Sequence, residues 1–150
     1  MDEKVKAKFI YEAIDDILKG KSDEDIISSM ENTDLDLDKL LVKSSEVGFL
    51  PGVKKALEMG ANIHAYNDYV LQIASGNGHL DVVDLLLKNG GDVHTDDDLA
   101  LQRASGNGHL DVVDLLLKNG ADVHAHNDHA LRWASVNNNL NVVELLKKYM

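Results

Sequence analysis

A seventeen-residue segment, Ala74 to Gly90, returns unchanged as Ala104 to Gly120, thirty residues further along the chain. It reads ASGNGHLDVVDLLLKNG in both places. An identical copy at this spacing means that one structural unit is used twice, and periods of roughly 20 to 50 residues are typical of stacked repeats. The sequence therefore predicts a stack of similar units.

The same thirty-residue register extends on both sides of the two copies. Leucines recur in phase at Leu41, Leu71, Leu101 and Leu131. Aspartates recur just before them, at Asp38, Asp68, Asp98 and Asp128. An aspartate before an apolar helical pattern is a good N-cap, because its carboxylate accepts hydrogen bonds from free backbone N–H groups. Four helices are therefore predicted to begin at these aspartates.

Glycines mark where the helices should end. Gly48, Gly78 and Gly108 follow the first helical pattern, and Gly60, Gly90 and Gly120 follow a second one rich in Leu and Val. Glycine closes a helix at low steric cost because it adopts the left-handed conformation readily. Each unit is therefore predicted to be a helix, a turn and a second helix, which makes the chain all-α.

This register divides the chain. Four repeats are predicted at residues 35–64, 65–94, 95–124 and 125–150, in one continuous domain. Residues 1–34 lie outside the register and have the apolar spacing of two helices, so they are predicted to cap the stack at its N-terminal end. At the other end, Lys147 stands where Leu117 stood one repeat earlier, as an outward-facing final helix requires.

Charge and composition exclude several classes of function. The chain has 150 residues, no cysteine and a formal net charge of -11. That charge would repel a phosphate backbone, so direct nucleic-acid binding is not expected, whereas a protein partner with a basic face would be attracted. No run of eighteen apolar residues occurs and no export signal is seen, so we expect no membrane span and a cytoplasmic location.

The segment GNGHLDVVDLLLKNGADVHA, residues 106–125, closely resembles the ankyrin repeat, and the resemblance extends over residues 38–150. It implies helix pairs joined by projecting finger loops, stacked into a solenoid that serves as a protein-binding scaffold. The family's Thr-Pro-Leu-His entry to the first helix is absent apart from its leucine. The period is also three residues shorter than usual, which implies short fingers and is similar to ankyrin arrays of large DNA viruses and some microbes.

The two central copies differ mainly just before the shared segment, in the finger and on the first helix. In ankyrin proteins this region lines the concave groove where partners bind. We therefore expect a partner surface that includes Tyr66, Tyr69, Asp96, Asp97, Leu99, Arg103, His126, His129 and Trp133. Tyr, Trp and Arg are the residues most often found in interface hot spots. Among them, Trp133 is expected to be packed in the core rather than free, and Arg103 to be at the surface.

Histidines raise the question of a metal site. His124, His126 and His129 lie within six residues, and three imidazoles could hold zinc. The favoured interpretation is structural: the in-phase His64, His94 and His124 cap helices or bond to neighbouring loops. Similarly, the in-phase pair His79 and His109 is expected to satisfy backbone groups. We expect no cofactor.

No catalytic constellation is recognisable. The in-phase serines lie in the helical register, and Gly76-Asn77-Gly78 lacks the strand and lysine of a phosphate-binding loop. The sequence therefore favours a non-catalytic, monomeric adaptor or inhibitor that binds a protein. Two alternatives remain open: an acidic decoy that imitates nucleic acid, and a structural or oligomerisation module.

Overall fold

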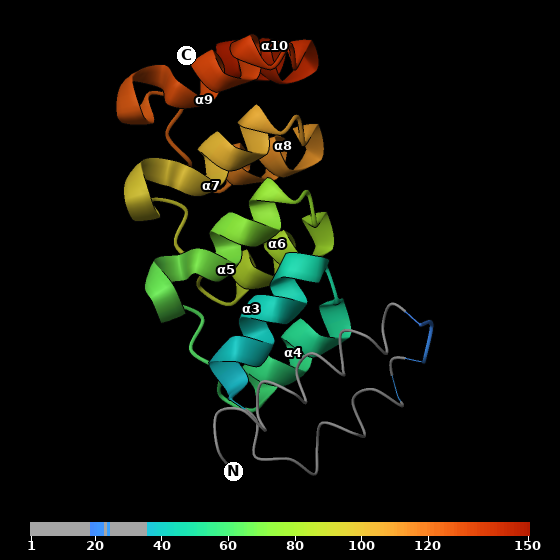
Figure 1. Ribbon diagram of the computed structural model, residues 1–150. Helices are drawn as coiled ribbons and strands as arrows, with labels where there is room; N and C mark the ends of the chain where they lie inside the picture. The colour runs from blue at the N-terminus through green and yellow to red at the C-terminus, as the bar shows by residue number, and fades with distance from the viewer. Residues whose placement is uncertain (1–18, 23, 25–35) are drawn as a thin grey trace.

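Eight helices follow one another in pairs in the described part of the chain, residues 19–22, 24 and 36–150 of a computed structural model (Figure 1). The pairs are α3 (Leu37–Val47) with α4 (Leu50–Glu58), α5 (Ala65–Gly76) with α6 (Leu80–Lys88), α7 (Thr95–Gly106) with α8 (Leu110–Lys118), and α9 (Ala125–Val136) with α10 (Leu140–Lys148). None of these described residues belongs to a β-strand. The all-α prediction is confirmed, whereas the predicted cap at residues 1–34 lies outside the described helices.

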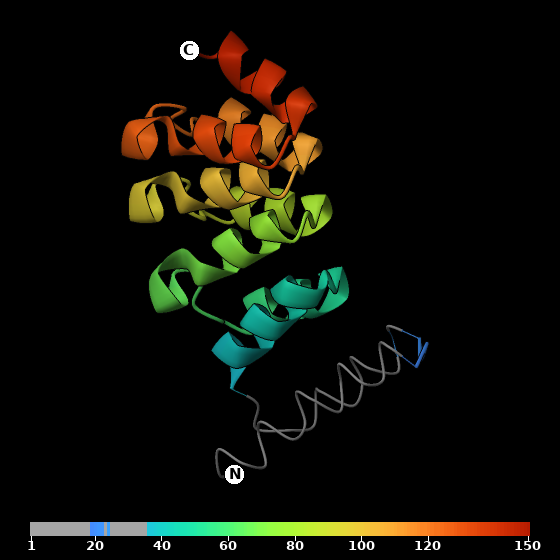
Figure 2. The same ribbon diagram turned by 45° about the horizontal axis from the view of Figure 1, so that its top comes forward.

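The helices form two layers. The first helices of the pairs, α3, α5, α7 and α9, stack on one another, and the second helices, α4, α6, α8 and α10, stack behind them (Figure 2). We call these the first-helix layer and the second-helix layer. Each helix has an apolar stripe that it must bury, and the neighbouring pair supplies the surface that covers it. The result is a solenoid in which each pair contacts the next.

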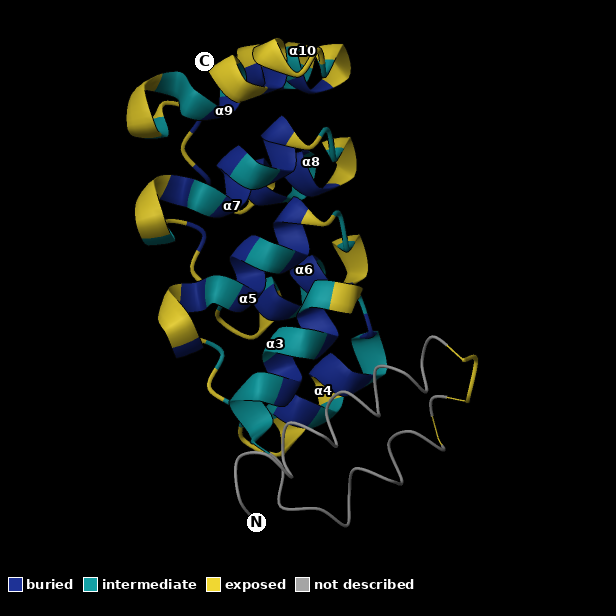
Figure 3. Cartoon of the chain, in the orientation of Figure 1, coloured by how far each residue is buried: buried dark blue, intermediate teal, exposed yellow. Residues whose placement is uncertain are grey.

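The core runs through the stack between the layers (Figure 3). Leu71 and Leu101 of the first-helix layer and Leu86 and Leu116 of the second are almost completely buried. Burying one such side chain contributes about 1.5–3 kcal/mol relative to leaving it exposed. At the last pair, Lys147 is exposed at the position that buried Leu117 occupies one repeat earlier, as predicted.

The turn between the two helices of a pair requires a left-handed residue. Gly78 and Gly108 have φ of 75° and 76°, and Asn138 keeps this conformation at the equivalent place with φ of 60°. Glycine is also needed for space, because a Cβ added at Gly108 would lie 2.8 Å from Oδ1 of Asn139 in the next repeat. Asparagine is tolerated at 138 because it is among the residues that visit this conformation most readily.

The same turn ties successive repeats together. His79 Nε2 donates a hydrogen bond to the carbonyl oxygen of Glu46 at 2.9 Å, and His109 Nε2 donates to that of Gly76 at 3.0 Å. Asn139 replaces the imidazole in the last repeat and donates through Nδ2 to the carbonyl oxygen of Gly106 at 2.9 Å. The prediction that His79 and His109 satisfy backbone groups is confirmed.

Candidate functional site

A left-handed turn opens the first helix in three of the four pairs. Three successive residues have positive φ in each turn: Tyr66, Asn67 and Asp68; Asp96, Asp97 and Asp98; His126, Asn127 and Asp128. The left-handed conformation costs about 1–2 kcal/mol for each residue that has a side chain, and Asn and Asp adopt it most readily. The chain places Asn or Asp at the second and third positions of every turn. These turns are the short fingers, exposed along one edge of the stack (Figure 3).

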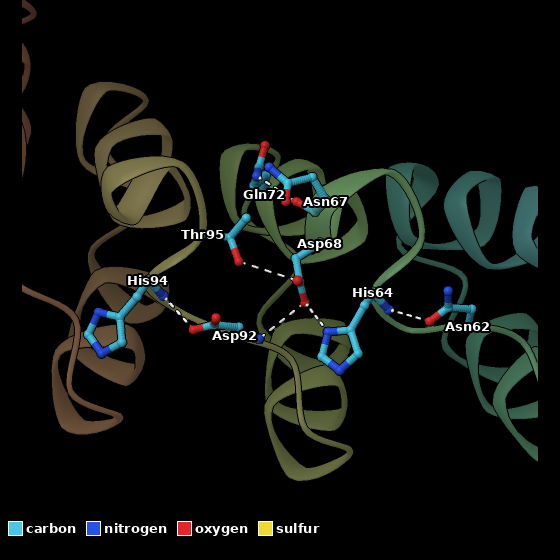
Figure 4. A network of polar contacts seen from close by, with 8 residues as sticks. All are labelled: Asn62, His64, Asn67, Asp68, Gln72, Asp92, His94 and Thr95. Atoms are coloured by element: carbon cyan, nitrogen blue, oxygen red, sulfur yellow. Dashed lines mark hydrogen bonds and ion pairs between the residues drawn. The ribbon is translucent and has the colours of Figure 1, made fainter.

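In the first two turns, the side chain of the third residue bonds to the loop that leads into the next repeat. The Asp68 carboxylate accepts from the backbone N–H of Asp92 at 3.2 Å and from the Thr95 hydroxyl at 3.3 Å (Figure 4). Asp98 accepts in the same way from the backbone N–H of Asp122 at 2.6 Å. Both carboxylates are buried. Their cost of burial is offset by these bonds, since buried charges need partners.

The predicted capping bonds of the in-phase aspartates are wrong, although right-handed helix does begin directly after Asp68, Asp98 and Asp128. The N-cap of α3 is Asp36, whose side chain accepts from the backbone N–H of Lys39, while the Asp38 carboxylate accepts from the N–H of Asn62. Histidines occupy the N-cap position of α5, α7 and α9, and their side chains make no cap hydrogen bond. The aspartates point toward the following loop instead, and Asp38 does so without a left-handed turn.

Those histidines bond to the aspartate four residues later. Nδ1 of His64 lies 2.9 Å from Oδ1 of Asp68, and Nδ1 of His124 lies 2.7 Å from Oδ1 of Asp128. The His94 and Asp98 pair repeats the contact at 3.1 Å. Each imidazole thus links the residue before the turn to the last residue of the turn. This fits the structural interpretation of the in-phase histidines.

A polar residue on the first helix closes each turn from the other side. Gln72 and Gln102 donate through Nε2 to the carbonyl oxygens of Asn67 and Asp97, at 3.1 Å and 2.6 Å. In the last turn, Arg132 Nε donates to the carbonyl oxygen of Asn127 at 3.0 Å. Sequence reasoning missed this role. The signal was present, because the three residues are in phase and polar at a place where the helix enters the stack.

Of the predicted surface residues, Asp96 is the most firmly held. Its carboxylate accepts from Asn67 Nδ2 at 2.7 Å and from Gln72 Nε2 at 3.0 Å, both in the preceding repeat. Tyr66, at the equivalent place one repeat earlier, is 63% exposed. Asp96 therefore links two turns, whereas Tyr66 presents its ring to solvent.

Tyr69 and Arg103 form one contact on the first-helix layer. The Arg103 guanidinium carbon lies 5.9 Å from the centroid of the Tyr69 ring, within the range of a cation–π interaction. Both side chains are half-buried, as is Leu99 on α7. A Cβ added at Gly76 would lie 3.3 Å from Cβ of Arg103, so the glycine makes room for the arginine.

Four predicted residues come together at the last repeat. Oδ2 of Asp97 lies 3.8 Å from Nδ1 of His126, whose ring centroid is 5.2 Å from that of His129. His129 in turn stacks on Trp133, with centroids 5.2 Å apart and planes 11° from parallel. We call His126, His129 and Trp133 the aromatic strip. It runs along α9 away from a carboxylate on the neighbouring turn.

The expectation that Trp133 is packed in the core is wrong. The side chain is 38% exposed, although one part of its ring lies over Gly106, where an added Cβ would be 2.8 Å from Cδ2. Trp133 thus contacts Gly106 and His129 while part of its ring stays exposed.

The surroundings of His129, the middle ring of the aromatic strip, favour its uncharged form at neutral pH. Partial burial lowers the pKa of His129 below its usual value, and the neighbouring Arg132 and His126 lower it further. The Nδ1–H of His129 donates to Oε1 of Gln102 at 2.7 Å, which fixes the ring against α7. A neutral, oriented imidazole therefore continues the indole surface.

Comparison with protein families decides the class. A model of ankyrin repeats (3 copies) matches residues 31–127 and 71–150. The chain belongs to the ankyrin repeat family. A search of curated proteins gave no significant match. The resemblance drawn from residues 38–150 is therefore confirmed at the level of the family, and ankyrin repeats are generally protein–protein interaction modules.

Other residues replace the ankyrin family's Thr-Pro-Leu-His entry to the first helix. This chain has Tyr69-Val70-Leu71-Gln72 and equivalents there, and Leu71 keeps its place in the core. The entry is ordered instead by Gln72, which donates to the turn, and by the Asp68 carboxylate, which accepts from the backbone N–H of Asp92 in the following loop. The short ankyrin finger is thus stabilised by a different set of polar contacts.

The histidines of the last ankyrin finger do not converge on one point. His124 turns to Asp128, and His129 turns to Gln102. Among residues 19–22, 24 and 36–150, no three His, Cys, Asp or Glu side chains are grouped as a metal ion would need.

No helix within the described residues has the length and apolar character needed to cross a membrane.

Proposed function

We propose that this ankyrin protein is a non-catalytic scaffold that binds a protein partner through the first-helix layer and its left-handed turns. One observation carries the proposal. The second helices α6 and α8 have identical sequences, whereas the exposed position at the start of the turn changes from Tyr66 to Asp96 to His126. A constant frame that displays unequal side chains is what recognition of one irregular partner surface requires.

The partner is proposed to carry a basic face. The chain has a formal net charge of -11, and Asp97 and Asp122 are exposed near the turns. Such a surface speeds encounter with a cationic partner and disfavours anionic ones. A stacked frame with braced turns needs little ordering on binding, so less of the contact energy is lost. The protein would act as a monomeric adaptor or inhibitor in the cytoplasm.

Imitation of nucleic acid is less well supported. The carboxylates of Asp96 and Asp98 are bonded within the protein, to side-chain amides and to a backbone N–H. Carboxylates that serve internal bonds are poorly placed to stand in for a row of phosphates.

Site-specific crosslinking would test the proposal. A photoreactive amino acid replaces Tyr66 in one variant and Asp81, which is exposed in the second-helix layer, in a matched control. Crosslinking in a lysate of the native host is followed by mass spectrometry at two salt concentrations. We expect a protein captured from position 66 and not from position 81, with capture that survives moderate salt because aromatic contacts contribute.

Equal capture from both positions would refute binding through the first-helix layer. Capture that disappears at moderate salt, and is confined to nucleic-acid-binding proteins, would favour the decoy.

A further inference from the structure

The aromatic strip combines exposed side chains with fixed ring orientations. Trp133 is 38% exposed, His126 is 57% exposed at its side chain, and Val136, one turn further along α9, is 82% exposed. The rings are nevertheless held in place by each other, by Gly106 beneath the indole and by the bond from His129 to Gln102. Oriented and exposed rings lose little entropy when a partner covers them, which is typical of a binding anchor.

The chain itself shows what such a surface accepts. One repeat earlier, Arg103 lies with its guanidinium over the Tyr69 ring, and its stem passes over Gly76. Trp133 occupies the position equivalent to Arg103, and His129 the position equivalent to Tyr69. The His129 ring is therefore presented on α9 in the register in which Tyr69 receives a guanidinium on α5.

Charge selects the same kind of ligand. Helices α7 and α9 carry four carboxylates, Asp96, Asp97, Asp98 and Asp128, against two arginines, Arg103 and Arg132. Arg103 is placed over Tyr69, and Arg132 donates to the carbonyl oxygens of Asn127 and His126. Asp97 is 76% exposed at its side chain and stands at one end of the strip. A cation at the His126 end of the strip would lie beside this carboxylate.

We propose that the aromatic strip and Asp97 together bind an arginine side chain of a protein partner. The guanidinium lies against the exposed part of the aromatic strip and pairs with the Asp97 carboxylate. Arginine suits this surface better than lysine, because its planar group stacks on aromatic faces and donates two parallel hydrogen bonds to a carboxylate. This inference rests on the proposed function and specifies the side chain that the partner contributes.

Trp133 is the one tryptophan of the chain, so its fluorescence reports directly on the strip. The probe is the blocked peptide acetyl-Gly-Arg-Gly-amide, titrated into the full-length protein at pH 7. The control peptides carry citrulline, which has nearly the same shape without the charge, or lysine. We expect a saturable change in Trp133 fluorescence in the millimolar range with arginine, a weaker affinity with lysine and no saturation with citrulline.

Two variants and one matched control locate the binding. Asp97→Asn removes the carboxylate, and we expect the arginine peptide to bind roughly two- to five-fold more weakly, as for an exposed ion pair. His129→Leu removes the stacked ring and is expected to have an effect of roughly the same size. Asp81→Asn removes the same charge from the exposed face of α6 and should leave the affinity unchanged. Circular dichroism confirms that each variant is folded.

Equal responses to arginine and citrulline, or no saturable response to arginine, would overturn the inference. So would equal weakening by Asp97→Asn and Asp81→Asn, which would indicate a general attraction to an acidic protein. The titration uses no partner, so its failure is separate from a failure of crosslinking at position 66. An arginine-insensitive protein that still captures a partner there loses this inference and keeps the proposed function.

Discussion

The segment that the chain repeats without change differs in role from the segments that precede it. Both copies, Ala74–Gly90 and Ala104–Gly120, bury two valines and at least one leucine of the second helix at equivalent positions, and both make the equivalent histidine bond to the previous repeat. Residues 65–73 and 95–103 instead carry the turns and the exposed part of the first helices. The identical segments, 74–90 and 104–120, therefore form the structural frame. The unequal segments, 65–73 and 95–103, form the displayed surface.

The comparison also shows that the division is not complete. The unequal segments contain Asp68 and Asp98, which are buried and hold the next loop, and Gln72 and Gln102, which close the turns. These four are in phase and of the same type in both repeats. Within the variable segment, therefore, the positions that stay equal are structural, and only the unequal ones are available for recognition.

The largest expected effect on the free energy of unfolding comes from truncating a buried leucine of the frame. Leu116 is fully buried, and Leu116→Ala should lower the free energy of unfolding by about 2–5 kcal/mol through lost burial and the cavity left behind. Tyr66→Ala, on the displayed surface, should change it by less than about 0.5 kcal/mol. Urea unfolding followed by circular dichroism measures both. Similar losses for the two variants would abolish the distinction between frame and surface.

The next largest effect on stability is expected from a glycine of the frame that contacts a side chain of the displayed surface. A Cβ at Gly106 would lie 2.8 Å from the Trp133 ring, so Gly106→Ala should destabilise the protein by about 1–3 kcal/mol and change Trp133 fluorescence. Gly76→Ala is the control, since its Cβ would meet Arg103 at the milder distance of 3.3 Å. The two variants are compared by thermal unfolding. A Gly106→Ala protein as stable as Gly76→Ala would show that the indole does not rest on this glycine.

The fold could be predicted because its signals are local and repeated. Leucines in phase and left-handed glycines such as Gly78 each determine one feature of the helix pair, and four copies reinforce the register. The direction of Asp68 could not be predicted, because the same aspartate suits a helix N-cap or an inter-repeat bond. Its direction depends on where the following loop lies, since Asp38 makes the equivalent bond without a left-handed turn.

The candidate site was predictable in its members but not in its grouping. Difference between the repeats pointed to His126, His129 and Trp133, yet only the stacked geometry joins them to Asp97 of the preceding turn. Trp133 was expected to be packed because equivalent positions are packed in the family. Its side chain is 38% exposed instead, because burial in a stack depends on the neighbouring side chains and not on the residue type alone.

A single hydrogen bond within the copied segment should have a moderate effect. His109→Ala removes the donor to the Gly76 carbonyl oxygen and should cost about 1 kcal/mol, because Asn107 still donates to the same oxygen. His109→Asn is the matched variant, since Asn139 makes the equivalent bond in the last repeat. It should recover most of the loss in a denaturation experiment. An equal loss for both substitutions would mean that the imidazole acts by filling space and not as a donor.

The smallest effect should come from a hydroxyl that the frame leaves without a partner. The hydroxyls of Ser75 and Ser105 are buried and make no hydrogen bond within the described chain, whereas Ser135, in the exposed last repeat, donates to the Leu131 carbonyl oxygen at 2.7 Å. An unpaired buried hydroxyl is costly, so Ser105→Ala should be neutral or raise the free energy of unfolding by up to about 1 kcal/mol. Ser135→Ala should not stabilise as much, because it loses a bond. If Ser105→Ala instead destabilises the protein, the serine hydroxyl contributes to the contact between repeats, and the copied segment would owe its identity to polar bonds as well as to packing.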